Sequence, residues 1–192
     1  MKILFISLGC DKNLADSEEM LGLLTGNGHE IVDSEEEADA IVINTCCFIH
    51  DAKEESVNTI LEMAEYKKTG TCKILIVTGC MAQRYKEEIT EEIPEVDAVL
   101  GTTSYGDIVK ALNEAEAGHV FREFKDINAL PEDSGRRVIT TGGHFGYLKI
   151  AEGCDKHCTY CIIPSLRGKF RSVPEELSLI HISEPTRLRR IS

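Results

Sequence analysis

Three cysteines lie close together in the stretch GCDKHCTYC. Three residues separate Cys154 from Cys158, and two separate Cys158 from Cys161. Iron–sulfur clusters are held by cysteine thiolates, and three of these on one short loop can bind three irons of a four-iron cluster. The fourth iron would then lack a protein ligand and stay open to a small molecule. The spacing therefore predicts a [4Fe-4S] cluster with one iron available for chemistry.

A zinc site is the alternative for this loop. His157 lies between the cysteines and could complete a set of three cysteines and one histidine. Structural zinc sites are usually built from two ligand pairs separated by a longer stretch. No second cysteine pair follows Cys161, so the sequence favours iron, and His157 is interpreted as a polar loop residue.

A second group of cysteines is predicted from the apolar runs that precede them. Cys10 follows ILFISLG, Cys46 follows AIVINT and Cys80 follows ILIVTG. If each run is a strand of a parallel sheet, all three cysteines lie at its carboxyl edge, where ligands of open α/β sheets bind. Gly9 and Gly79 would let the backbone turn tightly there. This equivalent placement favours shared ligation over the alternative of three ordinary small buried residues.

Two further cysteines are predicted to be non-ligands. Cys47 should point to the side opposite Cys46 if the strand continues, because side chains alternate along a strand. Cys72 begins a predicted strand instead of ending one. Either residue could be a neighbour of a cluster without binding iron.

The first 124 residues alternate short apolar runs with amphipathic stretches, as repeated strand–helix units do. Gly70 and Gly118 follow two of the expected helices, where a left-handed cap is common. The fold class is therefore α/β, with a parallel sheet in residues 1–124. We expect strands at 2–8, 29–32, 40–45, 73–78, 98–100 and 119–124, and helices at 16–24, 52–68, 83–92 and 105–117.

The pattern changes after residue 124. Residues 125–143 lose their periodicity and gather Gly, Pro, Asn and Asp, which predicts a linker between domains. A strand at 145–151 is expected to lead into the cysteine loop, as the strands of a βα-barrel lead into active-site loops. Residues 144–176 are therefore interpreted as the incomplete start of a second domain.

Composition limits the classes of function. The 192 residues are 42% hydrophobic, which is ample for a core, and the formal net charge of −12 disfavours a nucleic-acid substrate. Acidic runs such as Glu18-Glu19 and Glu91-Glu92 are expected to be solvated helix faces. We expect no membrane contact and a cytoplasmic location, because no leader or long apolar run is present. Eight cysteines in a reducing compartment indicate metal ligation or redox chemistry.

Residues 1–176 resemble the methylthiotransferase family of radical S-adenosylmethionine (SAM) enzymes. The resemblance is carried by SLGCDKNLADSE at 7–18 and GCDKHCTYCIIPSLRGKFRS at 153–172. It implies an N-terminal parallel-sheet methylthiotransferase domain, with its own three-cysteine cluster, followed by the beginning of a radical SAM βα-barrel. Both stretches are more similar to the type that modifies an aspartate of small-subunit ribosomal protein number twelve than to the tRNA-modifying type.

The resemblance also implies cofactors and site residues: two [4Fe-4S] clusters and SAM. Tyr160 would pack against the adenine of SAM. The implied reaction adds a methylthio group to the aspartate β-carbon through a 5'-deoxyadenosyl radical, with an electron donor such as flavodoxin or ferredoxin; catalytic side chains are not assigned. The ligands would be Cys154, Cys158 and Cys161 for the SAM-cleaving cluster, and Cys10, Cys46 and Cys80 for the auxiliary cluster.

Two other functions stay open. One is a tRNA methylthiotransferase, and the other is a non-catalytic metal-binding redox module with a flavodoxin-like domain and a zinc loop. Arg167, Lys169 and Arg171 follow the cysteine loop. They could meet an acidic group of SAM or substrate, or form a solvated basic loop, so no role is assigned to them.

The end of the chain departs from the family resemblance. After Glu176 the sequence continues as LSLIHISEPTRLRRIS, which lacks the helix and further strands of a barrel. Residues 177–192 are interpreted as a non-native tail. On this interpretation the chain is a truncated transferase, and we expect it to be inactive by itself.

Overall fold

The computed structural model describes residues 1–70, 72–130, 137–175 and 186–187. At its centre is a six-stranded parallel sheet in the order β2-β1-β3-β4-β5-β6. Apart from the added β6, this is the order of flavodoxin-like doubly wound sheets. The α/β prediction is confirmed. The strands are β1 Lys2–Ser7, β2 Glu30–Val32, β3 Ala40–Thr45, β4 Ile74–Gly79, β5 Ala98–Leu100 and β6 Phe121–Glu123.

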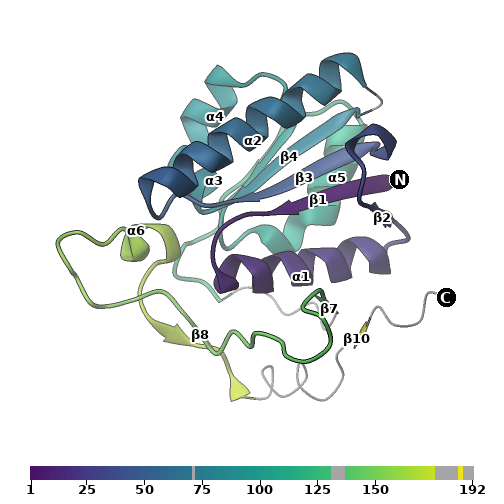
Figure 1. The fold of residues 1–192 in the computed structure, drawn as a ribbon. Helices are drawn as coiled ribbons and strands as arrows, with labels where there is room; N and C mark the ends of the chain where they lie inside the picture. Colours follow the sequence, from purple (N-terminus) through teal and green to yellow (C-terminus); the bar gives the residue numbers. More distant parts are fainter. Residues whose placement is uncertain (71, 131–136, 176–185, 188–192) are drawn as a thin grey trace.

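Helices cover both faces of the sheet (Figure 1). α1 (Asp11–Gly26) and α5 (Ile108–Glu116) pack on one face. α2 (His50–Thr69), α3 (Cys80–Arg84) and α4 (Lys86–Glu92) pack on the other. Two short 3-10 turns, η1 (Glu35–Glu37) and η2 (Tyr105–Asp107), complete this part of the chain. Within the described residues, no helix combines the length and the apolar character needed to cross a membrane.

The central strands are apolar on both sides because helices cover both faces. Ile41 and Ile43 of β3 belong to the core beneath α2, α3 and α4. Their neighbour Val42 belongs to the core with α1 and α5. All six residues of β3 and of β4 are buried, so these two strands hold a rigid centre from which the loops at the carboxyl edge project.

Several boundaries differ from the prediction. α1 begins at Asp11 rather than at residue 16, since its first turn follows directly from the β1 loop and carries an acidic residue near the helix N-terminus. The helix expected at 83–92 breaks at Tyr85 into α3 and α4. Gly118 has the expected positive φ of 82°. Gly70 does not: its backbone is extended, with φ −111° and ψ −160°, so that prediction is wrong.

The later part of the chain wraps around α1 and the carboxyl edge of the sheet (Figure 1). Its elements are β7 Val138–Ile139, β8 Ala151–Glu152, α6 Ile163–Arg167, β9 Arg171–Ser172 and β10 Thr186–Arg187. β8 pairs with β9 antiparallel, and β10 pairs with β7 parallel.

The strand expected at 145–151 is wrong, because only Ala151 and Glu152 pair with another strand. The carbonyl oxygens of Phe145 and Tyr147 accept hydrogen bonds from side chains of the 137–141 segment, and the side chain of Lys149 bonds to Asp16 of α1. The domain boundaries at 125–143, 144–176 and 177–192 stay predictions. Residues 131–136, 176–185 and 188–192 lie outside the described part of the chain.

Candidate metal centre at the carboxyl edge of the sheet

Cys10, Cys46 and Cys80 lie just beyond the carboxyl ends of β1, β3 and β4. These three strands are neighbours in the sheet (Figure 1). The strand order also reverses between β1 and β3, and ligands of doubly wound sheets bind at such a switch point. The structure therefore brings three cysteines from distant parts of the sequence to one edge, at the place where this fold class binds ligands.

Two glycines allow the loops at this edge to approach one another. Gly9 and Gly79 have φ values of 96° and 94°, in the region that favours glycine. A Cβ atom on Gly9 would lie 2.6 Å from Cβ and 2.9 Å from Sγ of Cys46. A Cβ atom on Gly79 would lie 2.5 Å from the carbonyl oxygen of Thr45. The tight turns expected at both glycines are present, and each one presses against the end of β3.

Asn13 in the first turn of α1 ties the three strand ends together. Its side chain is fully buried. Nδ2 donates hydrogen bonds to the carbonyl oxygens of Leu8 at 3.0 Å and Thr45 at 2.9 Å. Oδ1 accepts a hydrogen bond from Sγ of Cys80 at 3.7 Å. No role was predicted for Asn13; its place three residues after the candidate ligand Cys10 is the signal that the sequence offers.

Ser56 of α2 holds the backbone of Cys46. The Cys46 N–H donates to Oγ of Ser56 at 3.0 Å, and this hydroxyl donates to the Cys46 carbonyl oxygen at 2.8 Å. Cys46 and Cys80 are buried, whereas Cys10 is exposed at the N-cap of α1. The edge therefore has a fixed, buried side and an open side.

Burial raises the pKa of two thiols at this edge, Cys80 and Cys47. Burial raises the pKa of Cys80, and the charge and hydrogen bond of Arg167 offset part of that rise. Burial, followed by the nearby Cys80, raises the pKa of Cys47 to about 11. Metal ligation requires a thiolate, so a metal bound by Cys80 would have to displace its proton. Cys47 is thus a neighbour of Cys80, and its non-ligand status stays a prediction.

The donor set of this edge fits an iron–sulfur cluster in its chemistry. Three thiols lie at one edge of the sheet, and the turn at Gly9 lies directly against Cys46. Among the residues that the structure describes, however, no three Cys, His, Asp or Glu side chains are already arranged to hold a metal ion. The fold therefore gathers Cys10, Cys46 and Cys80 at one edge without placing their sulfur atoms in coordinating geometry.

The second cysteine group lies on one loop between β8 and α6. The N–H of Cys154 donates to the carbonyl oxygen of Gly168 at 3.1 Å, which closes the base of the loop. The N–H of Cys161 donates to the carbonyl oxygen of Cys158 at 3.1 Å. Cys158 is exposed, and Cys154 and Cys161 are half-buried. Tyr160 is 90% exposed, so its ring faces solvent, and its packing against adenine stays a prediction.

A buried network of charges connects this loop region to α1. Arg167, the last residue of α6, donates from Nη1 to Oδ2 of Asp16 at 2.7 Å and from Nη2 to Oδ1 of Asn13 at 2.5 Å. The same Nη1 lies 3.4 Å from Oε1 of Glu152. Lys149 pairs with Asp16 and lies 3.3 Å from Glu152. The four charged side chains are each 8% exposed or less.

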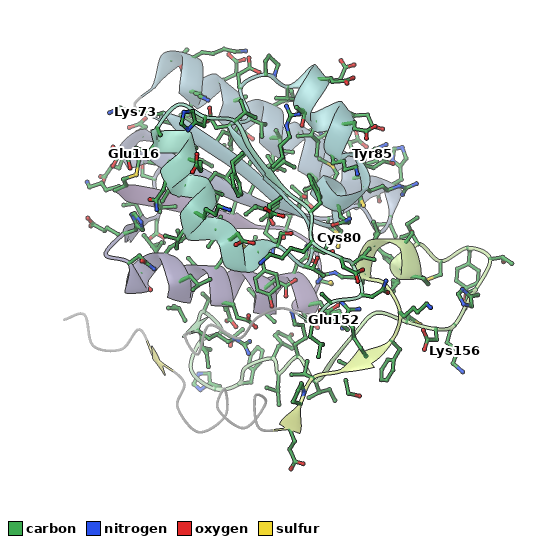
Figure 2. The ribbon with its side chains drawn as sticks, turned by 180° about the vertical axis from the view of Figure 1, so that it is seen from behind. Lys73, Cys80, Tyr85, Glu116, Glu152 and Lys156 are labelled. Atoms are coloured by element: carbon green, nitrogen blue, oxygen red, sulfur yellow. The ribbon has the colours of Figure 1, made fainter. Side chains whose placement is uncertain are left out.

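These charges stabilise one another in their ionised forms. Burial would raise the pKa of Asp16, but Lys149 and Arg167 outweigh it and hold that pKa below 3.8. Burial would lower the pKa of Lys149, but Asp16 and Glu152 outweigh it and raise that pKa above 10.5. Figure 2 labels Glu152 of this network, and Lys156 farther out on the cysteine loop.

The acidic pair Glu18-Glu19 is buried, so the expectation that it is a solvated face is wrong. Glu18 accepts hydrogen bonds from Arg137 at 2.6 and 3.0 Å and from the N–H and Oγ1 of Thr140 at 2.7 and 2.9 Å. Glu19 accepts one from the hydroxyl of Tyr105 at 2.9 Å. The 137–149 segment covers this face of α1 and supplies the donors of Glu18, whereas Glu19 accepts its hydrogen bond from Tyr105.

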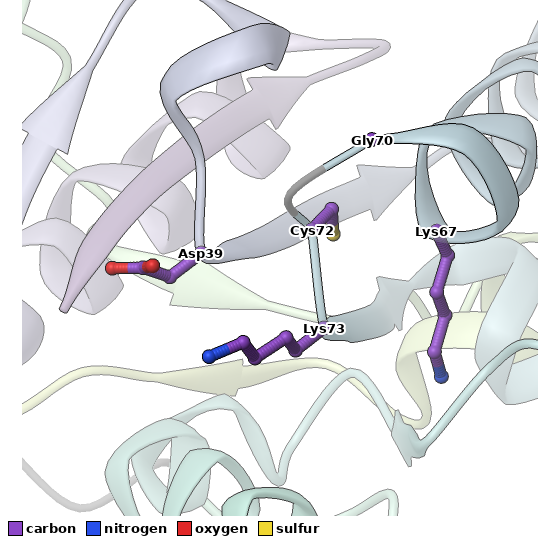
Figure 3. A pocket seen from close by; sticks show the side chains of 5 residues that line it. All are labelled: Asp39, Lys67, Gly70, Cys72 and Lys73. Atoms are coloured by element: carbon purple, nitrogen blue, oxygen red, sulfur yellow. The ribbon is translucent and has the colours of Figure 1, made fainter.

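A pocket of about 600 Å³ lies at the opposite end of the sheet, at the start of β3 and β4 (Figure 3). The thiol of Cys72 donates to the carbonyl oxygen of Ile74 at 3.3 Å. Cys72 therefore lies before the start of β4, far from the carboxyl edge, and its non-ligand status stays a prediction. The pocket is lined by Asp39, Lys67, Gly70, Cys72 and Lys73.

A doubly wound parallel sheet with three cysteines at its switch point defines the class: an α/β protein with a candidate metal centre. Residues 2–101 match the family model described as "Uncharacterized protein family UPF0004". This match covers more than half of the chain, and the chain belongs to this family.

Similar proteins carry a more specific name. The chain is 66% identical over 176 residues to the "Ribosomal protein uS12 methylthiotransferase RimO" of Lachnoclostridium phytofermentans, covering 92% of this chain and 40% of that protein. It is 52% identical over 172 residues to the protein of the same name from Clostridioides difficile, covering 90% and 39% of the two chains. The chain spans about 40% of the length of the curated relatives that it matches.

Proposed function

We propose that the chain works in a radical SAM methylthiotransferase that adds a methylthio group to the β-carbon of an aspartate in ribosomal protein uS12. The names of the relatives support this activity. The observation that carries it is the placement of Cys10, Cys46 and Cys80 at the ends of three neighbouring strands, in a chain that also has a separate three-cysteine loop. One group alone would not indicate sulfur insertion, whereas two groups provide for two clusters.

The two groups would have different tasks. The group at the sheet edge would hold the auxiliary cluster, and Cys154, Cys158 and Cys161 would hold the cluster that binds SAM, beside Tyr160. When bound, the clusters and SAM would supply the radical and the sulfur needed to modify an unactivated C–H bond. The chain's own contribution is to hold the two groups close together, because proximity decides what a reactive carbon meets first. Asn13 and Ser56 fix the loops of the first group.

A substrate, an electron donor and a location belong to the same proposal. A net charge of −12 favours a basic ribosomal protein over a nucleic acid. An electron donor such as flavodoxin or ferredoxin would reduce the SAM-binding cluster. We place the reaction in the cytoplasm, where thiols stay reduced.

Iron content tests the cluster assignment. The 192-residue chain, reconstituted without oxygen, is compared with Cys46→Ala and with the neighbouring Cys47→Ala as a matched control. Iron and acid-labile sulfide are measured in each. We expect Cys46→Ala to bind about four irons fewer than the parent chain and Cys47→Ala to bind as many as the parent. Equal losses in both variants, or zinc in place of iron, would contradict the assignment.

The substrate is tested separately with the full-length protein that contains these residues. Ribosomal protein uS12 and a tRNA anticodon stem-loop are each incubated with it, SAM and a reductant. We expect mass spectrometry to show one added methylthio group on an aspartate of uS12 and none on the RNA. Modification of the RNA alone would identify a tRNA methylthiotransferase instead.

A further inference from the structure

α6 connects the two cysteine groups directly. It starts at Ile163, two residues after the last cysteine of the loop. Leu166 of α6 is 2% exposed and packs in the same core as Cys80 and Met81 of α3. Thr102 donates from Oγ1 to the carbonyl oxygen of Leu166 at 2.9 Å. The helix that follows the loop therefore covers the helix that begins with a candidate ligand of the other group.

Arg167 fastens this helix to α1. Its guanidinium group bonds Asp16 at 2.7 Å and Asn13 at 2.5 Å with two different nitrogens. Asn13 in turn accepts the hydrogen bond from the thiol of Cys80. A continuous path of side-chain contacts therefore runs from α6 to Cys80 through Arg167 and Asn13.

The base of the cysteine loop is tied to the residue that follows Arg167. Gly168 has a φ of 74°, which turns the chain back, and its carbonyl oxygen accepts the N–H of Cys154. A Cβ atom on Gly168 would lie 2.6 Å from the carbonyl oxygen of Ile127, so the turn is closely packed. A shift of Arg167 would therefore move the first cysteine of the loop as well.

We propose that Arg167 is a positioning residue that docks α6 over Cys80 and thereby sets the place of the Cys154–Cys161 loop relative to Cys10, Cys46 and Cys80. Arginine suits this role because its planar group can bond two acceptors at fixed angles. That the cysteines hold clusters rests on the proposed function. The docking itself needs no metal.

Thiol protection in the metal-free, reduced 192-residue chain tests the docking. A short pulse of iodoacetamide is followed by peptide mass spectrometry, and the alkylation of Cys80 is compared with that of Cys72. Cys72 is also buried, 3% exposed against 7% for Cys80, but lies at the other end of the sheet, so it reports global unfolding. The variants are Arg167→Gln and Asp16→Asn, with the exposed Arg122→Gln as the matched control.

We expect Cys80 to be alkylated about tenfold faster or more in Arg167→Gln and Asp16→Asn, while Cys72 keeps its parent rate. Arg167→Lys should give an intermediate rate, because lysine keeps the charge beside Asp16 but cannot bond Asn13 at the same time. Amide hydrogen exchange should rise in residues 150–172 and stay unchanged in β3 and β4. Parent-like protection of Cys80 in both variants, or equal acceleration of Cys72, would overturn the proposal.

The alkylation test of the docking and the iron-content test of the proposed function can fail independently. If the chain binds no iron but the protection of Cys80 from alkylation is lost in Arg167→Gln, the docking stands and the cluster assignment fails. If iron binds as expected but the alkylation rate of Cys80 is the same in the parent and in Arg167→Gln, the cluster assignment stands and the positioning role fails.

Discussion

Glu18 and Arg137 form a buried ion pair between α1 and the segment that precedes β7, with Oε2 of Glu18 2.6 Å from Nη2 of Arg137. The glutamate side chain is completely inaccessible and that of the arginine is 7% exposed. Arg137 also donates to the carbonyl oxygen of Tyr147 at 2.5 Å. One pair thus anchors two parts of the later chain to the first helix of the sheet domain.

Glu18→Gln should destabilise the chain by about 3 kcal/mol at pH 7, because it leaves the Arg137 charge buried without its partner. The free energy of unfolding from urea denaturation measures the loss. Glu91→Gln, at an exposed position of α4, serves as the control and should change stability by about 0.5 kcal/mol or less. Equal effects of the two substitutions would mean that the pair contributes nothing specific.

The contribution of Asp16 to the stability of the fold depends on pH. Its folded pKa lies below 3.8 because Lys149 and Arg167 outweigh its burial. A lowered carboxyl pKa stabilises the fold above the unfolded pKa, and this contribution is lost as the pH falls through the folded pKa. Asp16→Asn should therefore be less stable than the parent by about 3 kcal/mol at pH 7, and the difference should shrink below about pH 4.

The contribution of Glu19 to stability should depend on pH in the direction opposite to that of Asp16. Burial, the largest influence, raises its pKa above 4.5. A raised carboxyl pKa gives a contribution that is present below the unfolded pKa and is lost as the pH rises through the folded pKa. Glu19→Gln should thus gain stability relative to the parent as the pH rises from about 3 to 7. Urea denaturation across this range checks both residues, and parallel trends for the two variants would refute the assignment.

Gly9→Ala should destabilise the turn after β1. Its φ of 96° is unfavourable for alanine, and the added Cβ would lie 2.6 Å from Cβ of Cys46. Strain and overpacking together are expected to cost about 2 to 4 kcal/mol. Gly106→Ala is the control, since no heavy atom lies within 4 Å of a Cβ there. A thermal or urea denaturation series that ranks the two variants equally would contradict this account of the turn.

Asn13→Asp replaces a donor by an acceptor of almost the same shape. The new carboxylate would face the carbonyl oxygens of Leu8 and Thr45, which now accept from Nδ2. We expect a loss of about 1 to 3 kcal/mol, because two buried acceptors lose their donor. Asn113→Asp, at an exposed position of α5, should be nearly neutral in the same denaturation measurement. If Asn13→Asp is equally neutral, Asn13 does not hold the strand ends together.

The elements with a strong local signal were predictable. The apolar runs that became β1, β3 and β4 are bounded by polar residues and glycine, and their positions agree with the structure to within one residue at each end. Because strands in a parallel sheet share a direction, the common edge of Cys10, Cys46 and Cys80 followed from the sequence as well.

Two of the errors share one physical cause. The expected strand at 145–151 and the expected solvated face at Glu18-Glu19 both rest on local pattern alone. A strand exists only where another strand pairs with it, and an acidic helix face is solvated only where nothing covers it. Here residues 137–149 pack on α1, which removed the strand and buried the carboxylates.

The sequence by itself determined the α/β class, the three strand-end cysteines and the separate cysteine loop, because short-range periodicity and spacing encode them. Only the tertiary structure decided that Arg167 is buried against Asp16 and Asn13, 151 and 154 residues away in the chain. A basic residue after a loop looks the same in sequence whether it is solvated or paired. Its partner is chosen by long-range packing, which no local pattern records.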